Sequence, residues 1–256
     1  MKIKLLIMNF SMLLPHLNFA GNGIFLSSNI WKSINRSDFS KILEKMNQRY
    51  DHTLSFSFEV THSSYRDYTT HIPSDQVKGY ISRSGDFMKS KLLGIETLIN
   101  SKYKLVIDSA SKVIMLSDPE KHSGTLISKQ DMLDNMNLCT SIEYLEENEL
   151  TVYRMSFDDN FPYKFVNFSM NTLGLVQKME FFMNTEVSDN QSNSSHGSKP
   201  RIEIFCENYN LSVAYPETYF DEGRYIRFEA GKPLPSIEFS KYKVLDLRKS
   251  KDGNKP

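Results

Sequence analysis

The side chains that could bind a metal are scattered along this chain of 256 residues. None of the histidines has a second His or a Cys at the spacing of a metal motif such as HExxH or CxxC. Three of them lie in and around one polar stretch, which favours solvated loop side chains. We therefore expect no metal site and no cofactor. The six histidines are His16, His52, His62, His71, His122 and His196.

Paired carboxylates are the next group that could do chemistry. Asp158-Asp159 and Glu146-Glu147 are adjacent in sequence and look like turns, where carboxylates are solvated. The chain also has no G-x-S-x-G nucleophile elbow, no P-loop and no G-x-G-x-x-G. We assign no catalytic residue and expect a protein that is not an enzyme. A hydrolase with a site built from distant acids, as in glycosidases, stays as a third hypothesis.

Two cysteines leave two alternatives open. Cys139 and Cys206 could pair in an oxidising compartment, but both lie beside strand-like runs. Two cysteines in a chain of this size do not make a disulfide scaffold. The pattern favours two buried free thiols over a native bridge.

The apolar side chains are more informative than the polar ones. Twelve Met and 17 Phe are spread over segments with alternating apolar and polar residues. In a closed sandwich such a face is core, whereas in a half-open barrel it lines a cavity for an apolar ligand. The sequence leaves both readings open. Our candidate ligand-binding residues are Leu54, Phe56, Phe58 and Val60, with Ile107 and Phe181 added.

Two helices are expected to accompany the strands. Residues 37–50 place Phe39, Ile42, Leu43 and Met46 at helical spacing, with Ser37 as the N-terminal cap. Residues 126–139 form the second candidate, with Ser128 as its cap and Asp131 in its first turn.

Strands make up most of the rest. The alternating stretch 53–61 is followed by five strand-like runs between residues 76 and 118, and by four more between 141 and 184. Links of two to four residues allow only hairpins, so we expect an antiparallel meander. A long strand from 201 and one or two more near the end complete the set. The predicted fold is mainly β: a curved antiparallel sheet or half-open β-barrel with two or three short helices.

The ends of the chain indicate export. Lys2 and Lys4 precede an apolar run, and cleavage after Ala20 fits a signal peptide over residues 1–20. The run is too short to span a bilayer and no lipid-anchor Cys follows it. We expect a periplasmic or secreted protein, peripheral at most to a membrane, with a single domain over 21–248. It includes a mobile polar loop at 185–200, and residues 249–256 form a disordered tail.

Charge excludes one class of partner. Without Lys2 and Lys4, 29 basic residues face 31 acidic ones, a net charge of −2. No basic surplus exists to neutralise a phosphate backbone, so we expect no nucleic-acid partner.

The order of elements resembles a known family, and several short motifs carry the resemblance. They are Gly79, Gly85-Asp86-Phe87, Ile99-Asn100, Ile107-Asp108 and the closing run Val244-Leu245-Asp246-Leu247-Arg248. The chain is similar in residues 37–184 and in its last strand to the periplasmic lipoprotein-carrier (LolA/LolB-like) superfamily, in particular to divergent members from Bacteroidetes. The resemblance implies a half-open antiparallel barrel, helices at its mouth and an apolar cavity that shields acyl chains.

Two functions follow as hypotheses. The first is an exported, non-enzymatic protein that holds an apolar ligand, a lipid or a lipoprotein acyl chain, in the concavity of a half-barrel. The alternative is a structural or adaptor subunit of a cell-envelope complex, with a closed apolar core and a protein partner. Fold-level analogy supports the first only by association.

Overall fold

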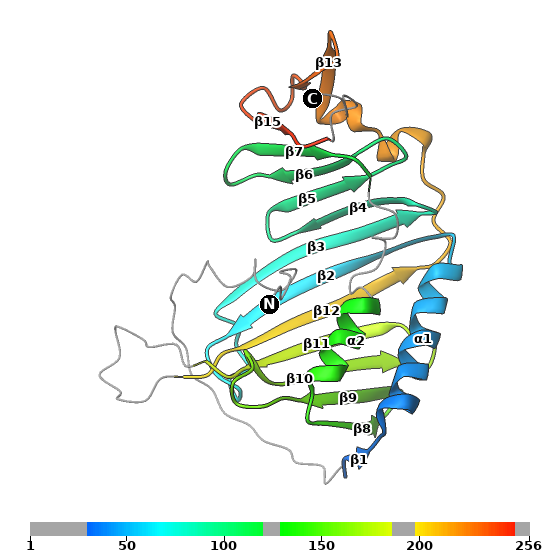
Figure 1. Cartoon of the computed structure of the whole chain (residues 1–256), viewed down its shortest axis with the longest axis vertical. Helices are drawn as coiled ribbons and strands as arrows, with labels where there is room; N and C mark the ends of the chain where they lie inside the picture. The colour runs from blue at the N-terminus through cyan, green and yellow to red at the C-terminus, as the bar shows by residue number, and fades with distance from the viewer. Residues whose placement is uncertain (1–29, 120–128, 186–197, 249–256) are drawn as a thin grey trace, which may run out of the picture.

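The computed structural model describes residues 30–119, 129–185 and 198–248. Thirteen of its strands form one sheet in the order β1-β8-β9-β10-β11-β12-β2-β3-β4-β5-β6-β7-β15. In Figure 1 the strands fan out as a single twisted layer. The described strands leave β1 and β15 as separate edges, so the sheet is open, and the prediction of a mainly β fold with an open sheet is confirmed.

The elements follow one another along the chain with these bounds. The first half contains β1 (Lys32–Ser33), α1 (Arg36–His52), β2 (Ser55–Tyr65), β3 (Asp75–Ser84), β4 (Phe87–Leu92), β5 (Ile95–Ile99), β6 (Lys104–Asp108) and β7 (Val113–Ser117). The middle contains α2 (Lys129–Leu138), β8 (Ser141–Glu147), β9 (Leu150–Ser156), β10 (Tyr163–Asn171) and β11 (Val176–Met183). The last part contains β12 (Arg201–Asn210), two 3₁₀ turns, η2 (Glu217–Phe220) and η3 (Glu222–Arg224), then β13 (Ile226–Glu229), β14 (Lys232–Pro235) and β15 (Lys243–Asp246).

The predicted meander is confirmed. β2 to β7 pair in sequence order and antiparallel, as do β8 to β11. Two tight links depend on glycine, because Gly85 and Gly94 have φ of +57° and +79°. β12 lies between β11 and β2 and joins the two meanders into one sheet.

The closing strand corrects the fully antiparallel prediction. β15 pairs with β7 in parallel, with Lys243 opposite Val113 and Asp246 opposite Leu116. Parallel neighbours need a long connection, and between β7 and β15 the chain runs through α2, the strands β8 to β12, both 3₁₀ turns and the β13–β14 hairpin. The excursion lets the last strand enter the edge beside β7 in the same direction.

The first helix agrees with its predicted stripe but not with its predicted cap. Phe39, Leu43 and Met46 are buried on one face of α1. The N-terminal cap is Asn35 rather than Ser37, because the Asn35 side chain accepts the hydrogen bond from the Asp38 backbone N–H at 2.9 Å. The second predicted helix is present as α2, while its predicted cap, Ser128, lies outside the described residues.

One core lies under the helices. We call the face of the sheet that α1 packs against the helix face; it carries Phe56, Phe58 and Val60 of β2. Figure 1 shows α1 and α2 crossing the half of the sheet formed by β8 to β12. Side chains from both helices and from these strands form the first core. It is centred on Phe39, Leu43, Phe56, Phe58, Phe168 and Cys206.

A second core lies on the other side of the same sheet. Leu98, Leu105 and Leu116 point to the side of the sheet away from the helices. We call this side the opposite face. The three leucines are 0–1% exposed, because the segment from η2 to β15 packs over them. Full burial of each such side chain contributes roughly 1.5–3 kcal/mol. The second core consists of Leu98, Leu105, Ile107, Ile114, Leu116, Phe220, Tyr225, Ile226 and Phe239.

Both cysteines are buried free thiols. Burial raises the pKa of Cys206 to about 12, so its thiol stays protonated inside the first core. The predicted signal peptide (1–20), most of the polar loop (186–197) and the tail (249–256) lie outside the described residues. The single domain over 21–248 stays a prediction.

Candidate apolar binding face

A row of directly opposed residues runs along the helix face from β2 to the edge strand β15. Cross-strand partners share a face of a sheet, so the pairing fixes the row without further assumption. In order, the row is Phe58, Ile81, Ser90, Thr97, Val106, Met115 and Leu245.

The first core occupies only one end of this row. It reaches Ile81 on β3, and Leu92 on β4 packs against its border. Further apolar side chains continue the helix face over β4 to β7 and β15, and they belong to neither core cluster. Most are half-buried, while Ile99 is buried at 4% exposure and Ile95 is exposed. We call this set the apolar extension: Met88, Ile95, Ile99, Val106, Val113, Met115 and Leu245.

Three predicted binding residues lie inside the first core. Phe56, Phe58 and Val60 are 1%, 3% and 2% exposed. The rings of Phe56 and Phe58 stack at 6.0 Å, and Phe58 stacks on Tyr209 at 4.7 Å. A ligand could touch these side chains only after α1 moves, so they form the floor of the face rather than an open lining.

Leu54 differs from its three neighbours. It is 81% exposed and precedes β2, which begins at Ser55. Its carbonyl accepts a hydrogen bond from Gly85 N–H at 2.7 Å, just beyond the pair of Ser55 and Ser84 at the open end of the β2–β3 hairpin. The alternating pattern extends one position beyond the packed strand, so Leu54 lies outside the face.

The last two predicted residues, Ile107 and Phe181, lie on different faces of the sheet. Ile107 lies opposite Ile114 on the opposite face, 1% exposed within the second core. Phe181 shares the helix face and packs against the first core, with its ring 5.5 Å from that of Tyr163. The structure therefore brings Phe56, Phe58, Val60 and Phe181 onto one face and places Ile107 behind it.

Sequence reasoning missed the apolar extension, although a signal was present. In β7, the run VIMLS is apolar at adjacent positions, so both faces of the strand are apolar. In β6, KLVID, Val106 lies between Lys104 and Asp108 on the helix face. A strand packed on one side only alternates with polar residues, and continuous apolar runs mark strands with two apolar faces. Val106 and Met115 are the second face of these strands.

Two polar features border the first core. His62 lies on the helix face of β2 opposite Ile204 and is 6% exposed. Burial lowers the pKa of His62, and the smaller effect of the Asp75 charge raises it. Near the end of α1, the Tyr50 hydroxyl lies 3.2 Å from that of Tyr209 and accepts from Val176 N–H at 3.2 Å. This network ties the helix to β11 and β12.

Neither a metal site nor a spanning helix is found in the described residues. Their His, Cys, Asp and Glu side chains form no group of three or more that could hold a metal ion. Within the same ranges, no helix has the length and apolar character needed to cross a bilayer.

Comparison with known proteins finds solved structures that this chain resembles, and nothing more. No family model matches the sequence, and no curated protein matches it. A LolA superfamily protein from Nitrosomonas europaea is 12% identical, with a TM-score of 0.31, over 71% of this chain and 96% of its own. A candidate outer membrane lipoprotein-sorting protein domain from Vibrio parahaemolyticus is 10% identical, with a TM-score of 0.28, over 73% and 98%. An uncharacterised conserved protein from Thermus thermophilus is 7% identical, with a TM-score of 0.37, over 79% and 98%.

The predicted resemblance to the lipoprotein-carrier superfamily is confirmed as a likeness, and the link to Bacteroidetes stays a prediction. All these TM-scores lie below 0.5, so the function has to follow from the chain's own side chains.

Proposed function

We propose that this chain is an exported, non-enzymatic protein that binds an apolar ligand, such as a lipid or a lipoprotein acyl chain, on the helix face of its sheet. The observation that carries the proposal is the row from Phe58 to Leu245. It extends an apolar face beyond the first core, where half-buried side chains such as Val106 and Met115 belong to neither cluster.

The dimensions suit an extended apolar chain. At a spacing of about 4.8 Å between strands, the five intervals from β3 to β15 cover roughly 24 Å. A ligand that covers the exposed part of this apolar surface stabilises the complex by about 25 cal/mol for each Å² of apolar surface removed from water. An acyl chain laid across the strands gains this energy along its whole length.

The composition of the strip sets its selectivity. Ser90 and Thr97 interrupt the row between Ile81 and Val106, but neither carries a charge. The row itself carries no charged side chain, while Lys104 and Asp108 of β6 and Lys243 of β15 flank it on the same face. The proposal therefore concerns ligands that are apolar over most of their length.

One observation favours the alternative, a structural or adaptor subunit with a closed core. Phe56, Phe58 and Val60 are at most 3% exposed beneath α1. A protein whose helix face is permanently filled would use its edges or loops to contact an envelope partner. The two functions differ in whether Val106 and Met115 touch cargo.

The test uses the protein purified gently from its native envelope, followed by organic extraction and mass spectrometry. We expect a stoichiometric lipid or lipopeptide with the wild-type protein and a clear loss of it with Val106→Asp. A carboxylate at that position has to be desolvated by any acyl chain that covers it. With a dansylated fatty acid as the probe, we expect binding to weaken at least tenfold, about 1.4 kcal/mol.

The control is Val152→Asp, since Val152 is also half-buried in a strand but lies on the opposite face of β9. Met115→Gln adds a milder change, so that misfolding of one variant does not decide the result; circular dichroism verifies the fold of each. Protein that carries no lipid but retains a fixed protein partner would establish the adaptor function instead.

A further inference from the structure

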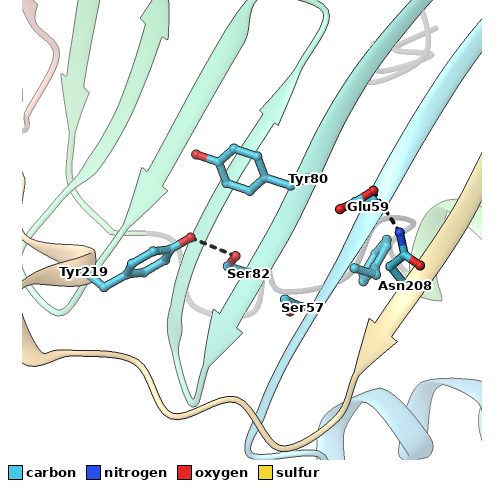
Figure 2. Close-up of a pocket in the computed structure, with 7 residues that line it drawn as sticks. Ser57, Glu59, Tyr80, Ser82, Asn208 and Tyr219 are labelled. Carbon is cyan, nitrogen blue, oxygen red and sulfur yellow. Dashed lines mark hydrogen bonds between the residues drawn. The ribbon is translucent and has the colours of Figure 1, made fainter.

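A polar hollow of about 250 Å³ opens on the opposite face, behind the first core. It lies between β2, β3, β12 and η2, and Figure 2 shows the side chains around it. The proposed acyl ligand would contact the helix face, so a molecule bound in this hollow would be a second, different ligand. The lining of the hollow comes from Ser57, Phe58, Glu59, Tyr80, Ser82, Asn208 and Tyr219, and all of these except Phe58 are polar or carry a hydroxyl group.

Two small residues create the hollow. Ser57 and Ser82 are directly opposed on β2 and β3, near the centre of the sheet. On the adjoining strands the same row continues with the larger Lys89 and Leu98. Strand centres are usually filled by large or β-branched side chains, and a pair of serines leaves space. Their hydroxyl groups also make the floor polar.

A fixed tyrosine forms one wall. The Tyr219 hydroxyl lies 3.1 Å from the Ser82 hydroxyl, as Figure 2 shows, and its ring packs 4.6 Å from that of Tyr215. The Lys89 ammonium lies 5.1 Å from the centre of the Tyr219 ring and 3.5 Å from Glu96. These contacts hold the ring in place before any ligand arrives, which lowers the entropic cost of binding.

Tyr80 adds a second aromatic ring, from β3. Its hydroxyl donates to Glu96 at 3.4 Å, and Tyr225 donates to the same carboxylate. Burial and the Glu96 charge raise the pKa of Tyr80, so the hydroxyl stays protonated. Two neutral aromatic side chains thus line the hollow.

An amide and a carboxylate form the rim on the far side. Asn208 Nδ2 donates to Glu59 Oε2 at 3.0 Å. Asn208 has a φ of +56°, at a shift in register between Glu207 and Asn210 of β12. The pair leaves Glu59 Oε1 as an acceptor beside the hollow, and Ser57 adds a hydroxyl that can donate or accept.

We propose that this hollow binds a single sugar ring, a hexopyranose that is free or part of a longer glycan. A pyranose has an apolar C–H face that packs on an aromatic ring and hydroxyl groups that donate to carboxylate and amide oxygens. The lining supplies both, and it is open enough for a glycan to continue outward. The hydroxyl groups of Ser57 and Ser82 on the floor favour a ligand with polar groups over an apolar chain.

Charged ligands fit less well. An anion would meet the carboxylate of Glu59, while Lys89 is already paired with Glu96 behind Tyr219. A cation would meet Glu59 favourably, but Lys89 already lies against the Tyr219 ring and repels a second positive charge there. A neutral ligand that donates hydrogen bonds satisfies all these groups.

The test is saturation-transfer NMR and calorimetry with the methyl glycosides of glucose, galactose and N-acetylglucosamine. We expect at least one to bind wild-type protein with a Kd in about the millimolar range. Ser57→Val fills the floor with a residue that strands favour, and we expect it to weaken binding more than tenfold. Ser156→Val is the matched control, a half-buried serine on the same face of β9, and should leave binding unchanged.

Two further variants separate the sugar from a cation. Glu59→Gln keeps an acceptor without the charge, so we expect sugar binding to stay within about threefold. Asn208→Gly tolerates the positive φ but removes the amide, and should weaken binding several-fold. Binding of agmatine that Glu59→Gln abolishes would replace the sugar with a cationic ligand. Failure of all three glycosides to bind, or full binding to Ser57→Val, overturns the proposal.

Discussion

His62 is a buried titratable residue on a mostly apolar face. Burial lowers its pKa from the ordinary value of 6.5. Between the lowered pKa and 6.5 the unfolded chain binds more protons at this position than the folded chain does. The free energy of unfolding therefore falls as the pH drops through this window and is fully restored above 6.5.

We expect urea unfolding to show this dependence between about pH 7 and about pH 5. His62→Gln removes the imidazole and should flatten the profile in that window. His71→Gln is the matched control, because His71 is exposed, and should keep the wild-type slope. An unchanged slope in His62→Gln would assign the pH dependence to other groups.

At the scale of elements, α1 is held to the sheet by Tyr50. Its ring packs edge-on to Phe56 at 5.8 Å, and its hydroxyl accepts from Val176 N–H. Loss of that hydroxyl leaves a buried backbone donor without its partner, which costs about 1–3 kcal/mol. Since α1 covers the first core, its attachment also controls access to Phe56 and Phe58.

We expect Tyr50→Phe to lower the unfolding free energy by about 1–3 kcal/mol and to speed amide exchange in α1. Tyr144→Phe is the control, since Tyr144 is half-buried against the same core, and should change stability by less than about 0.5 kcal/mol. Equal effects of the two substitutions would show that the Tyr50 hydroxyl does not hold the helix.

Elements were more predictable than their ends and faces. Helical spacing identified α1, and period-two runs with short links identified both meanders. The cap was misplaced because Ser37 and Asn35 are both good capping residues, and only the backbone geometry selects Asn35. The parallel β15 was missed because a run such as KVLD carries no mark of its partner's direction.

The position of the predicted binding residues on the sheet could be foreseen only in part, for a related reason. Alternation places Phe56, Phe58 and Val60 on one side of their own strand, which the structure bears out. It does not say which side of the sheet Ile107 joins, because this depends on the register through four successive hairpins. Leu105, Val106 and Ile107 of β6 are apolar in succession, so the sequence alone does not say which of them faces the helices.

For the molecule as a whole, the main feature is one sheet with a core on each face. The first core covers the β8–β12 half on the helix face, and the second covers β5 to β7 on the opposite face. The strands between them, β2 to β4, connect the two halves, and β2 and β3 contribute to the first core only. Because the backbone ladder is continuous, neither core can melt without exposing the edge of the other half.

We expect a single unfolding transition for both cores. Leu43→Ala in the first and Leu116→Ala in the second remove side chains that are 0% exposed, and each should cost about 2–5 kcal/mol. Calorimetry should show both substitutions shifting the same transition. Leu173→Ala, at an exposed position, should shift it little. Two transitions, each sensitive to only one substitution, would make the halves independent.

The position of β12 also sets the order in which the fold can assemble. Each meander closes through local hairpins, but β12 joins β2 across 136 to 153 positions of sequence, from Arg201 opposite Tyr65 to Asn210 opposite Ser57. Non-local pairing of this kind is slow. Until β12 is in place, β2 and β11 are unpaired edges beside apolar faces, the surfaces through which partly folded chains aggregate. A nascent chain thus exposes both edges until β12, which ends at Asn210, has been synthesised.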